Sequence, residues 1–431
     1  MKNSKKLILI LILLIAVAAA AFGVIKISQD RADYRAGRSG RADAAAAESG
    51  DIEAEGQSGG SGAGAEDQAE SGTSGGLKEL FKRKNGPLAT VFFASDYQGE
   101  PGFAYPGDTL LAVLNTAKAD GKNVQKVVMC GDYSNDIKLH DYQISPDEAI
   151  DEMRADIASV YPDVSGEKIM FIQGNHDKMT DRITKSGLHE EDGYLIYVLN
   201  TEKDFPWKQG KNEDSLKKVQ RSAAAMKACF DELIAEGETR PVFIAGHVPL
   251  QFTARTSSKH TTGDNLYSSL IFDVVNEAGK SLDIIYCFGH NHSKGWDCYL
   301  GGSSIYKAPG ETILIPRYKK GKKNTDKYSV DTLSFTYLNA GYIGYYMNCG
   351  PEENDAGELD KYHAADETLT GTVFEIYEDR IDITRYDAGG VHVLSHAGEG
   401  NPYKGGIDKG LIPEKYYSSE IKSPQTLARH N

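Results

Sequence analysis

The sequence has little cysteine, no internal repeat and no excess of basic residues. Its five cysteines are widely separated, with no CxxC pair, at positions 130, 229, 287, 298 and 349. This pattern excludes a disulfide framework and a zinc finger. Acidic residues outnumber basic ones, 62 to 48, for a net charge of -14. Because affinity for a nucleic-acid backbone depends on Lys and Arg neutralising phosphates, we expect small-molecule or protein partners instead.

One long apolar run stands at the N-terminus. Residues 7–25 are apolar throughout and follow three lysines. At about 1.5 Å per residue, a helix of that length crosses roughly a bilayer core. Residues 1–27 are therefore predicted to be a membrane anchor or, because the run contains small alanines, a cleaved signal segment. The short basic tail favours a single-pass protein with its bulk outside the cell, or a secreted one after cleavage, although basic residues also follow the run.

The next segment, residues 28–86, contains few large apolar side chains and is rich in Ala, Gly, Ser and acidic residues. Such a stretch cannot bury enough surface to offset the entropy of ordering the chain. We therefore expect a flexible linker there, which leads to a folded domain over residues 87–400 and a C-terminal tail over residues 401–431.

Within residues 87–400, short apolar runs recur, and each ends in polar residues. The runs are ATVFFASDYQ, KVVMCGDYSND, KIMFIQGNHD, PVFIAGHVPL and DIIYCFGHNHS. Their length and their Val, Ile and Phe content suit strands buried on both faces. Helical spacing of apolar residues is clearest over residues 214–236, with Gly237 as the stop. Strands that alternate with helices predict an α/β fold with its functional groups at the carboxyl ends of the strands.

The polar residues at these strand ends are carboxylates, amides and imidazoles: Asp96, Asp132, Asn175, His247, His290 and His292. Such donors suit two divalent ions such as Mn, Fe or Zn rather than thiolate-bound metals. A carboxylate such as Asp132 can bridge two ions about 3.5–4 Å apart, which then hold a hydroxide that attacks phosphorus. The pattern indicates hydrolysis of phosphate esters, in which His176, oriented by Asp177, would assist the leaving group.

In order and spacing, these segments resemble the calcineurin-like metallophosphoesterase superfamily. Its pattern is D-x-H, G-D-x-x-[DN], G-N-H-[DE], a single H, and G-H-x-H, and this chain matches at residues 131–135, 174–177, 246–247 and 289–292. The resemblance implies a four-layer α/β/β/α sandwich of two mixed sheets, with residues 372–387 as its closing hairpin. It also implies a first metal on Asp96 and His292, a bridging Asp132, and a second metal on Asn175, His247 and His290. His176 would then lie by the substrate.

The chain departs from the family pattern at Gln98, where the family places a histidine ligand. We count Gln98 among the ligands, but its amide oxygen coordinates transition metals more weakly than imidazole does, so a looser first site is expected. Two functions follow: a metal-dependent hydrolase of phosphate mono- or diesters, or a surface binding protein on the same scaffold whose first metal site has degraded. The His176-Asp177 pair favours the hydrolase, because a binding protein needs no general acid. The sequence leaves the substrate, the metal and the oligomeric state open.

Overall fold

The structure is a computed structural model that describes residues 86–98, 106–134, 145–207, 209, 213–250, 266–290, 306–317, 328–343, 351–353, 359–362, 370–387 and 425–430. The expected anchor at residues 1–27, all but the last residue of the expected linker, and His292 lie outside these residues. Within the described ranges, no helix combines the length and the apolar character that crossing a bilayer requires.

The first sheet has six strands in the order β16-β15-β14-β1-β2-β3. Their bounds are β1 Ala89–Ala94, β2 Lys126–Met129, β3 Ile169–Phe171, β14 Thr370–Ile376, β15 Arg380–Asp387 and β16 Gln425–Ala428. The sheet is mixed, because β1, β2 and β3 pair in parallel whereas β14, β15 and β16 pair antiparallel. The hairpin of β14 and β15 is the one expected at residues 372–387. The expected tail instead contributes β16, which pairs with the edge of this sheet.

The second sheet also has six strands, in the order β4-β5-β6-β7-β11-β8. Their bounds are β4 Gly187–Glu191, β5 Tyr194–Leu199, β6 Val242–Gly246, β7 Ile284–Phe288, β8 Tyr306–Lys307 and β11 Thr336–Asn339. The inner strands β5, β6, β7 and β11 are parallel, and the edge strands β4 and β8 are antiparallel to their neighbours. The expected α/β class with two mixed sheets is thus confirmed. Two further strand pairs are present: β9 Thr312–Pro316 with β10 Tyr328–Thr332, and β12 Pro351–Glu353 with β13 Leu359–Tyr362.

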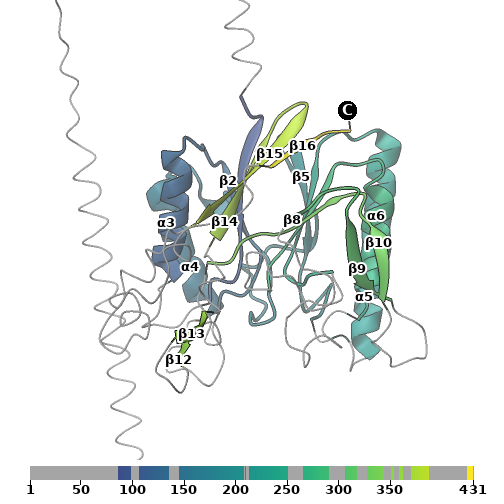
Figure 1. The fold of residues 1–431 in the computed structure, drawn as a ribbon, viewed down its shortest axis with the longest axis horizontal. Helices are drawn as coiled ribbons and strands as arrows, with labels where there is room; N and C mark the ends of the chain where they lie inside the picture. The colour runs from purple at the N-terminus through teal and green to yellow at the C-terminus, as the bar shows by residue number, and fades with distance from the viewer. Residues whose placement is uncertain are drawn as a thin grey trace, which may run out of the picture. The chain divides into compact units, whose positions relative to one another are not determined.

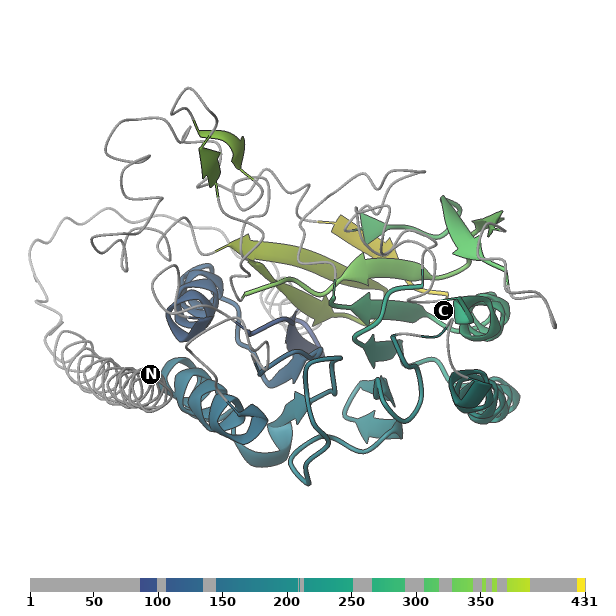
Figure 2. The ribbon, with the colours of Figure 1, turned by 90° about the horizontal axis from the view of Figure 1, so that it is seen from below.

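Two pairs of helices flank the sheets. They are α3 Pro106–Ala119 and α4 Pro146–Val160 beside the first sheet, and α5 Glu213–Glu236 and α6 Ser268–Ala278 beside the second (Figures 1 and 2). A short 3-10 helix, Gly166–Lys168, precedes β3. Helix α5 confirms the helix predicted at residues 214–236. Its apolar stripe, which includes Val219, Met226 and Phe230, packs against the second sheet in one apolar core.

A second apolar core fills the space between the sheets. Phe93 of the first sheet stacks on Phe243 of the second with ring centroids 5.4 Å apart, and Phe374 meets both rings edge-on at 5.2 and 5.0 Å. Strands covered on one face by this core and on the other by helices need apolar residues at every position. This burial explains why the strands read as continuous apolar runs in the sequence.

The C-terminal Arg429 ties the two sheets together at the amino ends of β6 and β7. Its guanidinium donates hydrogen bonds to the Thr239 carbonyl before β6 and to the Tyr377 carbonyl after β14, the latter at 2.8 Å. It also pairs with Asp283, just before β7, at 3.3 Å, and the side chains of Arg429 and Asp283 are only 6% and 10% exposed. Arg429 therefore links the two sheets through its side chain, and we call this set of contacts the Arg429 clasp.

We expect Arg429→Ala to lower the free energy of unfolding by about 2–3 kcal/mol, because it removes the guanidinium partner of the largely buried Asp283 carboxylate together with its hydrogen bonds to the Thr239 and Tyr377 carbonyls. The melting temperature should fall by roughly 5–10 °C. Arg380→Ala is the matched control, because Arg380 lies on the same sheet but pairs at the surface with Asp379 and Asp382. Its loss should change stability by less than about 1 kcal/mol. Equal shifts for the two variants in thermal unfolding would contradict the clasp.

Candidate metal centre

Five strands from both sheets deliver predicted ligands to the same edge of the fold. The residues that follow β1, β2, β3, β6 and β7 are, respectively, Asp96, Asp132, Asn175, His247 and His290. Because neighbouring strands are parallel here, their carboxyl ends lie together. Backbone hydrogen bonds join them, from the Asp96 N–H to the Gly131 carbonyl at 2.8 Å and from the Gly289 N–H to the His247 carbonyl at 3.1 Å.

The backbone is strained at three of these positions. Asp96, Asp132 and His290 have positive φ angles of 55°, 59° and 69°. Residues other than glycine rarely adopt this left-handed conformation, which costs on the order of 1–3 kcal/mol each unless the surroundings enforce it. Such strain is common at functional sites, where the direction of a side chain is maintained at the expense of a low-energy backbone conformation.

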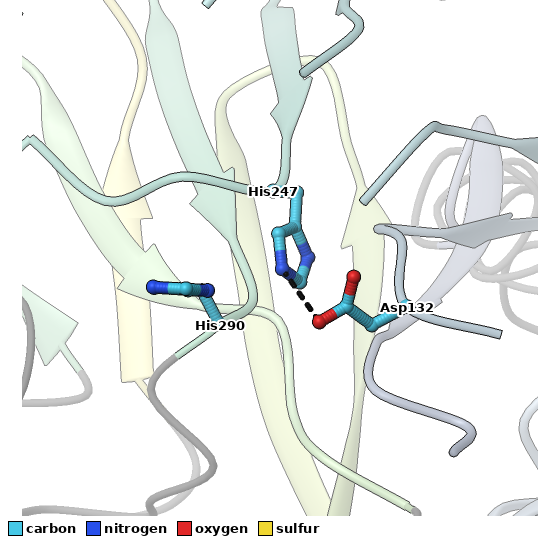
Figure 3. A group of neighbouring side chains, drawn as sticks. All are labelled: Asp132, His247 and His290. Carbon is cyan, nitrogen blue, oxygen red and sulfur yellow. Dashed lines mark ion pairs between the residues drawn. The ribbon is translucent and has the colours of Figure 1, made fainter. Parts of the chain in front are cut away.

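Asp132, His247 and His290 form a buried cluster whose ligand atoms lie within 4.8 Å of one another (Figure 3). Nε2 of His247 is 3.1 Å from Oδ2 of Asp132 and 3.0 Å from Oδ1 of Asn175. On the other side of the same ring, Nδ1 is 2.8 Å from the Cys130 carbonyl, which can only accept, so Nδ1 carries the proton. In the neutral ring, Nε2 therefore carries a lone pair and lies beside two oxygens, and a nitrogen and two oxygens together are the donor set of a divalent cation.

The electrostatics of the cluster indicate concentrated negative charge. Burial disfavours ionisation of Asp132, but His247 and the N–H of His176 hold the pKa of that carboxyl well below its usual range. Burial also lowers the pKa of His247, yet the carboxylates of Asp132 and Asp96 outweigh it and raise this pKa to about 9. A bound cation would neutralise the same carboxylates, so the residues present fit a metal ion.

Glycine is required where the loop at Gly131 touches the loop at Gly174. A Cβ on Gly174 would lie 2.1 Å from Oδ1 and 2.2 Å from the backbone N of Asp132. Gly131 has a φ of +95°, and a Cβ there would lie 2.7 Å from the Gly174 backbone. The two loops can approach this closely only without side chains at these positions.

Asp177 holds these loops together. Its carboxylate accepts four backbone N–H groups, from Asp132, Tyr133 and Gly174 at 2.7–2.8 Å and from Ser134 at 3.2 Å. Burial and the Asp132 carboxylate raise the pKa of Asp177 to about 6, against these donors, which favour its ionised form. These contacts make Asp177 an anchor of the Asp132 loop, and its predicted role in orienting His176 stays a prediction.

His176 is half-buried beside the cluster. Its N–H donates to Oδ1 of Asp132 at 2.8 Å, and its carbonyl accepts from Oγ of Ser134 at 2.7 Å. Its main chain is thereby fixed on both sides, which sets the point from which its imidazole extends.

Asp96 and Gln98, two of the residues predicted for the first metal, lie next to this cluster. Asp96 is fully buried, and its Oδ2 accepts from Oγ of Ser95 and, at 3.0 Å, from the His290 N–H. Gln98 is 1% exposed, and its N–H donates to the Asp132 carbonyl at 3.1 Å. His292 lies outside the described residues, so its ligand role, like that of Gln98, stays a prediction.

A comparison with protein-family models agrees with this geometry. Residues 91–294 match the model described as calcineurin-like phosphoesterase. The chain carries a calcineurin-like phosphoesterase domain. The match supports a phosphoester hydrolase of the metallophosphoesterase class, and the matched residues include the strand ends that hold Asp132, His247 and His290.

Three solved structures are similar to this chain at low identity. A dimetal phosphatase from Danio rerio matches over 70% of this chain and 97% of its own, with 11% identity and a TM-score of 0.41. PhoD matches over 70% of this chain and 66% of its own, with 11% identity and a TM-score of 0.38. A predicted phosphoesterase from Streptococcus pneumoniae matches over 79% and 98%, with 11% identity and a TM-score of 0.27. A sequence search of curated proteins found no match.

Two residues beside the predicted ligands, Gln173 and Trp207, belong to no motif that would single them out. Gln173, fully buried, donates from Nε2 to the Asp177 carbonyl at 3.1 Å and accepts the Glu202 N–H on Oε1 at 3.1 Å. It thereby joins the His176 loop to the loop that follows β5. The half-buried Trp207 packs its ring 5.7 Å from that of His290. Gln173 directly precedes the GNHD motif, and this position could have marked it as a site residue. Trp207 is identified only by its packing against His290 in the structure.

Proposed function

We propose that the domain hydrolyses phosphate mono- or diesters with two divalent ions, Mn, Fe or Zn, at the strand ends. The observation that carries the proposal is the convergence of Asp132, His247 and His290 within 4.8 Å, in full burial. Asn175 would complete this second site, since its Oδ1 faces the same nitrogen of His247. Asp96, Gln98 and His292 would hold the first ion. Asp132 would be a ligand of both ions.

When bound, such ions polarise the phosphoryl oxygens and acidify the water that attacks phosphorus. The chain's own residues supply the rest. Asp177 and the two motif glycines hold the Asp132 loop in place. His176, fixed through its main chain, would pass a proton to the departing oxygen, which otherwise leaves as a costly alkoxide.

Steady-state hydrolysis of p-nitrophenyl phosphate, its bis-ester and phenyl phosphate, with added Mn, Zn or Fe(II), tests the proposal. The wild type should turn over at least one of these esters. His176→Ala should lower kcat for phenyl phosphate by about 10²–10⁴-fold, with a smaller loss for p-nitrophenyl phosphate, whose leaving oxygen is less basic and needs a proton less. Metal content and melting temperature should not change.

His189→Ala is the matched control, because His189 lies on β4 and contacts the Lys185 carbonyl at 2.7 Å, outside the cluster. It should keep the wild-type kcat. If the wild type and His176→Ala were equally inert with every metal, the hydrolase proposal would fail and the surface binding protein would be favoured.

A further inference from the structure

A tight turn after β11 lies between the two sheets next to Asp96. In this turn, residues 339–343, the Ala340 N–H donates to the Phe288 carbonyl of the second sheet at 2.7 Å. The Tyr342 carbonyl accepts the Thr370 N–H of the first sheet at 2.8 Å. Gly341 has a φ of +113°, and a Cβ there would lie 2.3 Å from the Thr370 carbonyl. The turn therefore has little freedom to move, and only glycine fits at its centre.

Ser95 connects this turn to the Asp96 carboxylate. Its side chain is completely buried, and its Oγ donates to the Gly341 carbonyl at 2.8 Å and to Oδ2 of Asp96. One hydroxyl proton is thus shared between a carbonyl of the turn and the carboxylate. The His290 N–H also binds this Oδ2 at 3.0 Å, so the Asp96 carboxylate is oriented from two sides, by His290 after β7 and, through Ser95, by the turn.

Arg385 supports the turn from the first sheet. It is 9% exposed, and its guanidinium donates to the Asn339 carbonyl and, at 3.3 Å, to Oγ1 of Thr370. Asn339 in turn accepts the Gly341 N–H on Oδ1 at 2.9 Å. Burial lowers the pKa of Arg385 to about 9, which reflects the cost of placing a cation between the sheets. The hydrogen bond from Arg385 to the Asn339 carbonyl offsets part of that cost, and it holds the Asn339–Gly341 turn in position.

We propose that Ser95 and Arg385 are positioning residues that orient Asp96 toward the first metal. Arg385 holds the turn, the turn holds Ser95, and Ser95 sets the carboxylate. The inference rests on the proposed function, since it takes Asp96 as a metal ligand. The first site needs such support, because Gln98 replaces an imidazole there and the remaining ligands must carry more of the affinity.

Mn²⁺ titration of the full chain by calorimetry, with metal content of the purified protein as a second readout, tests this proposal. Ser95→Ala should weaken one of two binding events by about 10-fold or more, the usual range for loss of an outer partner of a ligand. The other event and the melting temperature should be nearly unchanged. Ser268→Ala is the matched control: it removes an equally buried serine hydroxyl, whose Oγ donates to the Leu250 carbonyl at 2.8 Å rather than to the turn or to a carboxylate. Both of its affinities should match the wild type.

Arg385→Met should weaken the same event, and the double variant Ser95→Ala/Arg385→Met should be no weaker than Ser95→Ala alone, because Arg385 acts through Ser95. If the losses of metal affinity in the two single variants added up in the double variant, Arg385 would not act through Ser95. A wild type with two binding events and an unchanged Ser95→Ala overturns the positioning role but leaves the proposed function standing. A wild type that binds no metal overturns the proposed function itself. Ser95→Ala decides the positioning role even if Arg385→Met fails to fold.

Discussion

Asp132→Asn is expected to lower kcat/KM for phosphate esters by at least about 10³-fold, equivalent to about 4 kcal/mol of transition-state stabilisation. Asp132 is the carboxylate of the buried cluster and the predicted ligand shared by both ions. The amide has the same shape, but it removes the charge and presents an NH2 group that cannot coordinate a cation. Steady-state kinetics with saturating metal, together with the metal content of the purified variant, would measure the loss.

Glu375→Gln provides the control for removing a carboxylate. Glu375 lies on β14 and pairs with Lys122 at 2.7 Å, away from the cluster. Its activity and metal content should match the wild type. An Asp132→Asn enzyme that kept a tenth or more of the wild-type kcat/KM would show that the cluster is not the catalytic centre.

Asp177→Asn is expected to lower the free energy of unfolding by about 3–5 kcal/mol, the second large effect. The four backbone N–H groups that Asp177 accepts are buried, and an amide nitrogen in place of one carboxylate oxygen would turn two acceptor positions into clashing donors. Denaturant unfolding would measure the change. Activity should fall with it, because the same contacts hold the Asp132 loop.

His176→Ala separates the two possible roles of Asp177. If Asp177 mainly oriented the imidazole, Asp177→Asn and His176→Ala would lose similar activity at nearly unchanged stability. The contacts predict the opposite: His176→Ala stays as stable as the wild type within about 1 kcal/mol, because its side chain is half-buried and the main-chain hydrogen bonds remain. Equal stability of both variants would reject the anchoring role.

Much of the fold could be predicted from the sequence, because the signals are local. The apolar runs that became β1, β2, β3, β6 and β7 are buried on both faces, and helix α5 shows its buried stripe in its spacing. Strand β16 was missed, since Gln425–Ala428 alternates exposed and half-buried residues and is a strand only by pairing with β15. Its clasp at Arg429 depends on Asp283, far away in the chain, and no local pattern reports such a contact.

The candidate site divides in the same way. Residue types at strand ends predicted Asp132, Asn175, His247 and His290, which the fold brings together. The anchoring role of Asp177 could not be read from its position beside His176, because it depends on which backbone N–H groups face its oxygens. The predicted membrane anchor at residues 1–27 and the ligand role of His292 stay predictions.

By itself, the sequence determined which chemical groups are available and that they stand where buried strands end, because burial and strand length are encoded in neighbouring residues. Only the tertiary structure decided which atoms meet: a histidine nitrogen aimed at two oxygens, a carboxylate clamped by four amides, and a buried arginine behind a turn. Those meetings depend on the packing of two sheets against each other, and the separation of residues along the chain carries no record of that packing.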